Sequence, residues 1–350
     1  MKPALLLAGH GTRDPEGVAG FTALTKRLAA AAEAAGAGFA ELAGAGPAGE
    51  PGARIDVAGG FIELSAPPLR DAVADLVERG HRDLVAVPLM LSAAGHSKGD
   101  VPAALAREKA RRPGLAIRYG RPLGPHPILL NLLAERISAA ARDLPAPYAV
   151  LVAGRGSTDP DANAEVCKDA RLLWEGRDYA FTETAFVSLA RPGIAGGLER
   201  CRRLGARGVV VARYFLFPGV LPDRVAAEAA SYAAGHPGLA VRCADVLGDC
   251  DEIAGLVAER YREAIDGDIR MNCDVCQYRT ALPGFTHRVG APQHPHDHPH
   301  DHPHGHPHGH PHGHADGHAD GHAEPPHDLD DAPGAARVRA RWRPSHRDAG

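Results

Sequence analysis

The segment Leu5–Gly17, LLLAGHGTRDPEG, decides the fold of this chain. Its uncharged apolar run ends in Gly9-His10-Gly11, and short apolar runs bounded by glycine are typical of buried parallel strands. The glycines permit a sharp turn, after which Thr12 or Asp14 can cap a helix. His10 is therefore expected at the carboxyl end of the first strand, where open α/β sheets bind their ligands.

The alternation of strands and helices continues through the first half of the chain. Strands are expected at 3–8, 54–62, 84–89 and 115–119, and helices at 17–35, 67–79, 102–111 and 127–142. The stretch 36–53 is rich in glycine, alanine and proline and is expected to be a surface loop. A second loop, LSAAGHSKGDVP at 91–102, carries His96. Prolines near residue 145 mark a boundary.

The pattern then repeats. The segment Tyr148–Asn163, YAVLVAGRGSTDPDAN, matches the opening stretch, with Arg155 in the place of His10, and Phe186–Gly205 aligns with Phe61–Gly80. A repeat of this size predicts two similar α/β domains with parallel sheets and a cleft between them. The expected divisions are 1–145, 146–267 for a degenerate copy, 268–287 for a cysteine segment and 288–350 for a histidine-rich tail.

The two copies differ at the residues that could carry chemistry. His10 is replaced by Arg155, Glu63 corresponds to Ser188, and the loop that holds His96 corresponds to FPGVLPDRV, which has no histidine. Candidate ligands therefore remain only in the first copy. This asymmetry predicts one active site between two unequal halves.

Composition limits the classes of function. Hydrophobic residues make up 44% of the chain and support real cores, while the formal net charge of −4 argues against a nucleic-acid partner. The longest apolar stretch, Leu84–Gly95, is interrupted by Pro88, so no membrane span is expected. The six cysteines do not form a disulfide framework, and the opening apolar run is too short for a signal peptide. A cytoplasmic location is the simplest interpretation.

Three side chains follow the carboxyl ends of predicted strands, namely His10, Glu63 and His96. If these strands are neighbours, two imidazoles and a carboxylate converge and suit Co²⁺, Fe²⁺, Ni²⁺ or Zn²⁺. A histidine can also accept a proton during a reaction. The alternative for each histidine is a turn residue bonded to the backbone. The glycine turn lacks a phosphate-loop pattern, so nothing specific supports a nucleotide site.

The last part of the chain holds two further candidate metal regions. Cys273 and Cys276, in MNCDVCQY, supply half of a zinc site or half of an iron–sulfur cluster, or are free thiols. A full site needs further ligands or a second chain, and a shared cluster would predict a homodimer. The histidine-rich region is predicted to be disordered without metal and to bind Co²⁺, Ni²⁺ or Zn²⁺. Its candidate ligands are His294, His296, His298, His300, His302, His304, His306, His308, His310, His312 and His314.

Four segments together resemble the sirohydrochlorin chelatases, which are class II tetrapyrrole chelatases of the cobalt- and iron-inserting type. They are LLLAGHGTRDPEG, FIELSAPPL, PLMLSAAGHSKGDVP and MNCDVCQYR, and the resemblance covers most of residues 1–280. It implies ATP-independent insertion of a divalent metal into sirohydrochlorin between two flavodoxin-like domains. It also implies that His10 and His96 hold the metal and take up pyrrole protons, with Glu63 as a helper.

The substrate of that reaction carries many carboxylates, so cationic residues are expected in the cleft. Arg13, Lys98 and Arg155 are the candidates, and the alternative for each is a solvated surface charge. The histidine-rich tail favours cobalt insertion, as in cobalamin biosynthesis, over iron insertion for siroheme, because imidazole holds Fe²⁺ less tightly in the usual affinity order. A cobalt or nickel chaperone or storage protein, and a two-lobed small-molecule binding protein, are the alternatives from other classes.

Overall fold

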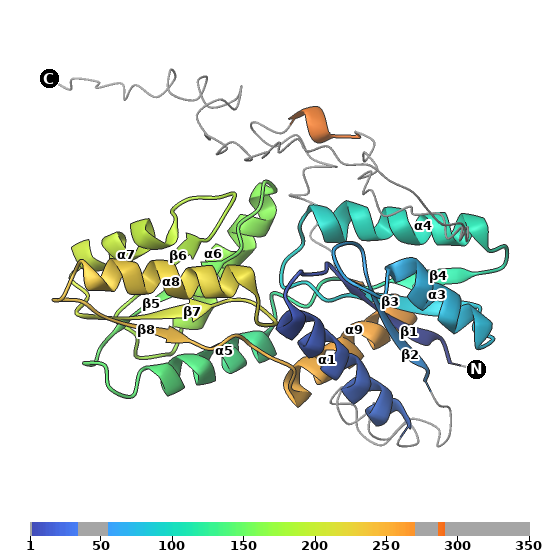
Figure 1. Cartoon of the computed structure of the whole chain (residues 1–350), viewed down its shortest axis with the longest axis horizontal. Coiled ribbons are helices and arrows are strands. Elements are labelled where there is room, and N and C mark those ends of the chain that lie inside the picture. The colour runs from blue at the N-terminus through green and yellow to red at the C-terminus, as the bar shows by residue number, and fades with distance from the viewer. Residues whose placement is uncertain (1, 34–54, 270–285, 291–350) are drawn as a thin grey trace, which may run out of the picture.

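Two four-stranded parallel sheets, each covered by helices on both faces, form most of the molecule (Figure 1). The computed structural model describes residues 2–33, 55–269 and 286–290. The first sheet has the order β2-β1-β3-β4 and the second the order β6-β5-β7-β8. The strands are β1 (Ala4–Gly9), β2 (Val57–Phe61), β3 (Asp83–Pro88), β4 (Ala116–Tyr119), β5 (Ala149–Gly154), β6 (Thr182–Phe186), β7 (Gly208–Arg213) and β8 (Ala240–Ala244). The predicted fold class of two similar α/β halves is confirmed.

The register of the two sheets reproduces the sequence repeat residue by residue. Leu5 of β1 pairs with Val57 on one side and with Val85 on the other. Its counterpart Val150 of β5 pairs with Thr182 and Val210. The two halves therefore share one strand arrangement, and their differences lie in side chains.

Helices of nearly the predicted lengths connect the strands. They are α1 (Pro15–Glu33), α3 (Leu69–Glu78), α4 (Val101–Arg111), α5 (Pro127–Ala140), α6 (Pro160–Trp174), α7 (Ile194–Arg203), α8 (Val220–Ala234) and α9 (Asp251–Asp266). One expected loop is different, because a short π-helix, His96–Asp100, precedes α4. His96 therefore begins a helical turn instead of lying in an irregular loop.

The last helix of each half covers the sheet of the other half. Helix α5 follows β4 in the chain but packs against β7 and β8, and α9 follows β8 but packs against β3 and β4. Figure 1 shows α9 beside α1 below the first sheet and α5 below β8. The expected boundary near residue 145 separates the two sheets, but the packing of α5 and α9 crosses it.

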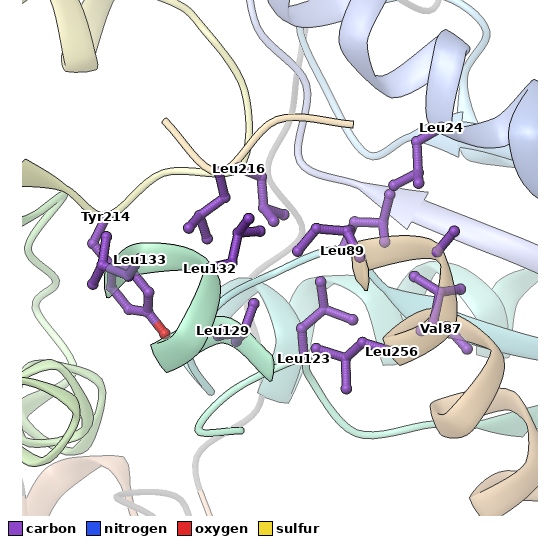
Figure 2. Close-up of a cluster of buried hydrophobic side chains, with 14 of the residues drawn as sticks. Leu24, Val87, Leu89, Leu123, Leu129, Leu132, Leu133, Tyr214, Leu216 and Leu256 are labelled. Carbon is purple, nitrogen blue, oxygen red and sulfur yellow. The ribbon is translucent and has the colours of Figure 1, made fainter. Parts of the chain in front are cut away.

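This exchange produces one hydrophobic core that spans both halves. In β1, Leu5 and Leu7 face this shared core, whereas Leu6 and Ala8 face a separate core under α3 and α4, as the alternation of side chains along a strand requires. Figure 2 shows the region where the halves meet, with Leu24, Val87 and Leu256 on one side, Leu129, Leu132, Leu133, Tyr214 and Leu216 on the other, and Leu89 and Leu123 between them. The two halves are therefore joined by apolar packing.

Several sequence-based expectations lie outside the described residues. They concern the loop at 36–53, the cysteines Cys273 and Cys276, and the histidines from His294 onward. Among the helices that the structure describes, none combines the length and the apolar character needed to cross a bilayer.

Candidate metal-binding and active site

The topology of the first sheet brings together the three predicted ligand residues. Strand β1 lies between β2 and β3, and their carboxyl ends meet at one edge. His10 directly follows β1, Glu63 follows β2 by two residues, and His96 begins the π-helix after β3. One ligand atom from each of these side chains lies within 4.8 Å of the other two. The structure thus places two imidazoles and one carboxylate at a single point.

Close approach of two backbone turns sets the position of Glu63 beside His10. The Glu63 amide donates a hydrogen bond to the His10 carbonyl at 3.1 Å. Gly11 has φ +108°, and a Cβ atom at this position would come 1.8 Å from the Glu63 carbonyl oxygen. Only glycine fits there, so the Gly9-His10-Gly11 turn brings the histidine against the second strand. The second half repeats this contact with Gly156 and Ser188.

The side-chain distances at the cluster are short. His10 Nε2 lies 2.9 Å from His96 Nε2 and 3.1 Å from Glu63 Oε1. The two imidazole rings meet edge to face, with their planes at 89° and their centroids 4.2 Å apart. Bound divalent ions hold imidazole nitrogens and carboxylate oxygens about 2.0–2.2 Å from the metal, so neighbouring ligand atoms lie roughly 3 Å apart. The spacing of this cluster fits such an ion.

The outer nitrogens of both histidines are already engaged. His10 Nδ1 lies 3.1 Å from the Gly11 carbonyl oxygen, and His96 Nδ1 lies 2.6 Å from Asp100 Oδ2. Both partners accept hydrogen bonds, so we assign the proton of each neutral ring to Nδ1. Each Nε2 then presents a lone pair to the other Nε2 across 2.9 Å. With this assignment the two lone pairs face each other, an arrangement that a bound cation would stabilise.

Burial lowers the pKa of both histidines. Burial first, and then the charges of His96 and Arg155, lower the pKa of His10 from 6.5 to about 4. Burial and Arg155 also lower the pKa of His96. At neutral pH both imidazoles are therefore neutral, and their Nε2 lone pairs are available to a metal ion.

The cluster faces a cleft with a volume of about 1190 Å³ between the two halves. Residues from both copies line it, including Arg155 and Tyr214 of the second half, and the short helix Thr286–Arg288 contributes His287 and Arg288. This volume exceeds the usual 300–1,000 Å³ of pockets for drug-sized ligands. The cleft therefore suits a large ligand.

The three predicted cationic residues have different surroundings. Arg13 and Arg155 are exposed and line the cleft, where they can contact an anionic ligand. Lys98 lies elsewhere, because its side chain is only 5% exposed and does not line the cleft. Its Nζ donates to Asp159 Oδ2 at 2.9 Å and to Asp161 Oδ2 at 2.8 Å. Lys98 instead forms a buried ionic contact between the halves.

The sequence alone does not identify Asp100 or the acidic residues of α6 as part of this site. Asp100 orients His96, and its spacing of four residues from His96 would be informative only if the segment were known to be helical. On α6, Glu165 accepts a hydrogen bond from the Ala93 amide at 2.7 Å, close to the turn that carries His96. The acidic residues Asp161, Glu165 and Asp169 of α6 are buried, which the sequence alone does not indicate.

Comparison with known proteins places this chain in a family. Residues 4–140 and 149–264 match the family model described as CbiX. The chain is 37% identical over 283 residues to the sirohydrochlorin cobaltochelatase of Priestia megaterium. This alignment covers 80% of this chain and 85% of that protein. It is also 30% identical over 192 residues to the sirohydrochlorin ferrochelatase of the same organism, in an alignment that covers 51% of this chain and 72% of that protein.

A solved structure shows the same architecture. SirB from Bacillus subtilis with Fe³⁺ has a TM-score of 0.59 and 26% sequence identity, with 77% of this chain and 98% of that chain covered. The family model spans both halves of the repeat, and the cobaltochelatase relative is similar over most of its own length. This chain therefore belongs to the CbiX family, together with the sirohydrochlorin chelatases.

Proposed function

We propose that this protein inserts a divalent metal ion, with Co²⁺ favoured over Fe²⁺, into sirohydrochlorin without ATP. The observation that carries the proposal is the meeting of two imidazole lone pairs and one carboxylate in a cleft of about 1190 Å³. The relatives named sirohydrochlorin cobaltochelatase and sirohydrochlorin ferrochelatase support the reaction. In this reaction the metal ion is a substrate, and the cobalt product serves cobalamin biosynthesis.

His10, His96 and Glu63 have two tasks in the proposed reaction. They hold the ion at one face of the macrocycle, and the lone pairs that the ion leaves as it enters the ring can then accept the two protons that the pyrrole nitrogens release. The lowered pKa of His10 means that it holds such a proton briefly and passes it on to water. Arg13 and Arg155, which line the same cleft, are proposed to bind the substrate carboxylates.

The decisive experiment uses the purified full-length chain with sirohydrochlorin and Co²⁺, Fe²⁺ or Ni²⁺ in the absence of ATP, followed by absorbance. His10→Ala is expected to abolish metal insertion and to leave the circular dichroism spectrum unchanged. His236→Ala, which removes a histidine that does not line the cleft, is the matched control. Near-normal turnover by His10→Ala would refute the assignment. Binding of Co²⁺ without any insertion would instead support a metal chaperone or storage protein.

We also propose that the histidine-rich region supplies metal to this cleft. His287 and Arg288 line the cleft, and the first histidine of that region, His294, follows six residues later in the sequence. Deletion of residues 291–350 is expected to leave turnover unchanged at saturating Co²⁺ and to lower it when Co²⁺ is scarce. Equal turnover under both conditions would count against delivery.

Cys273 and Cys276 are proposed to bind an iron–sulfur cluster, with a second copy of the chain or further ligands completing it. The proposal rests on the C-x-x-C spacing and on the resemblance of MNCDVCQYR to the sirohydrochlorin chelatases. Anaerobic purification with ultraviolet-visible and EPR spectra tests it. A colourless, iron-free protein would refute it.

A further inference from the structure

Two leucines at equivalent positions have an unfavourable backbone conformation. Leu64 has φ 62° and Leu189 has φ 61°, and in the described part of the chain they are the non-glycine residues with positive φ. Each is the centre of a three-residue turn, since the Ser65 amide donates to the Glu63 carbonyl at 2.7 Å and the Ala190 amide donates to the Ser188 carbonyl at 2.7 Å. Turns of this hand are rare and strained for a residue with a branched side chain.

Both of these side chains keep a large exposed surface in the folded chain. Leu64 is 42% exposed and Leu189 is 53% exposed, so neither contributes a fully buried side chain to a core. A glycine would adopt the same φ without strain. Strained residues are often found where a ligand is held, and both leucines line the cleft that contains the candidate metal site.

The pair is retained in both halves although the adjacent ligand residues differ. Leu64 follows Glu63 in the first half, and Leu189 follows Ser188 in the second. Glycine with positive φ, Gly11 or Gly156, packs against the turn in each case. The leucine turn is therefore separate from the metal chemistry, which only the first half carries.

We propose that Leu64 and Leu189 form a paired apolar contact, one from each half, for the flat ring of the tetrapyrrole. This inference rests on the proposed function and deepens it. A macrocycle with carboxylates on its rim needs apolar contacts for its ring and cations for its edge, and the cleft offers both, with Arg13 and Arg155 as the cations. Because Leu64 directly follows Glu63, a contact there would hold the ring beside the metal ligands.

The test measures binding of sirohydrochlorin to the full-length chain without metal, by absorbance titration, and then KM and kcat for Co²⁺ insertion. Leu189→Gly is expected to weaken binding about tenfold, the effect expected when roughly half of a leucine side chain is covered. KM should rise by a similar factor while kcat at saturating substrate stays the same, because the metal ligands are untouched. Leu64→Gly should weaken sirohydrochlorin binding by a similar factor. The double variant should bind sirohydrochlorin about a hundredfold more weakly than the unmodified chain.

Three comparisons separate a ligand contact from a structural role. Leu189→Gly relieves the backbone strain, so its Tm is expected to equal or exceed that of the unmodified chain while binding falls. Leu189→Met keeps an apolar side chain and should bind nearly normally. Leu204→Ala removes a leucine that is 60% exposed outside the cleft and should change nothing.

Each outcome has a distinct meaning. Glycine variants that bind sirohydrochlorin as tightly as the unmodified chain would refute the leucine contact and leave the proposed function intact. Failure of the unmodified chain to bind sirohydrochlorin would refute the proposed function itself.

Discussion

Asp100 determines which nitrogen of His96 is available to a metal ion. Its carboxylate accepts a hydrogen bond from the Nδ1–H group of His96 at 2.6 Å, which leaves the Nε2 lone pair directed at His10. Carboxylates that hold a ligating histidine in this way raise its basicity and fix its ring orientation. The candidate metal site therefore depends on Asp100 for the orientation of one of its three ligand side chains.

Replacement of Asp100 tests this dependence. Asp100→Ala is expected to raise the KM for Co²⁺ by about 10- to 100-fold, the usual cost of losing such a partner. Asp100→Asn, which keeps an oxygen acceptor but loses the charge, should lie between this variant and the unmodified chain. Asp71→Asn, on the exposed surface of α3, is the matched control. An unchanged KM in Asp100→Ala would show that the ring is oriented by its surroundings alone.

His10 should make the stability of the protein depend on pH. Burial is the main cause that lowers its pKa from 6.5 to about 4 in the folded state, so between these values the unfolded chain binds a proton that the folded chain does not. Stability is therefore lost as the pH falls through this window. We expect the free energy of unfolding of the unmodified chain to fall between pH 7 and pH 5, and that of His10→Gln to fall by about 2 kcal/mol less. Urea unfolding at the two pH values measures both changes. His236→Gln should lose as much stability as the unmodified chain.

At the residue scale, the sequence predicts which side chains gather but not their partners. His10 and Glu63 could be placed because each follows a recognisable buried strand. Asp100 could not, because the segment HSKGD has no hydrophobic periodicity that identifies a helical turn. Lys98 could not either, because its carboxylate partners lie 61 and 63 residues away in the other half.

At the scale of elements, α6 connects the second half to the turn that carries His96. Lys98 reaches Asp159 and Asp161 at the start of this helix, and Glu165 accepts a hydrogen bond from the Ala93 amide. Burial raises the pKa of Glu165 to about 7 despite that hydrogen bond. The half without metal ligands thus supports the metal site through buried polar contacts.

Lys98→Met should lower the free energy of unfolding of the protein. Removal of the ammonium leaves Asp159 and Asp161 buried without their cation, and breaking such a group typically destabilises a protein by about 3–5 kcal/mol. Chemical denaturation measures the change. Adding Asp159→Asn and Asp161→Asn to the same chain should recover much of the loss, and Lys26→Met, on the exposed surface of α1, should have little effect. A stable Lys98→Met variant with a raised KM for sirohydrochlorin would instead restore the substrate-binding role.

At the scale of the whole molecule, the exchange of α5 and α9 could not be predicted. Both helices occupy the same place in the repeat, each after the last strand of its half, and each has one apolar face. Exchange of two equivalent helices leaves the hydrophobic pattern of the sequence unchanged. The sequence therefore predicts the layers of each half correctly but cannot assign the last helix to a sheet.

The exchange predicts that neither half folds alone. A fragment of residues 1–145 lacks α9, so Val85 and Val87 of β3 lose the helix that covers them, while α5 has no second sheet to pack on. We expect this fragment alone to lack a cooperative unfolding transition and to bind a dye for exposed apolar surface. Co-expression with residues 146–290 should restore a cooperative transition, because each fragment supplies the helix that the other needs. A fragment of residues 1–145 that unfolds cooperatively on its own would show that α5 can return to its own sheet. In that case the exchange would not be needed for the stability of the first half.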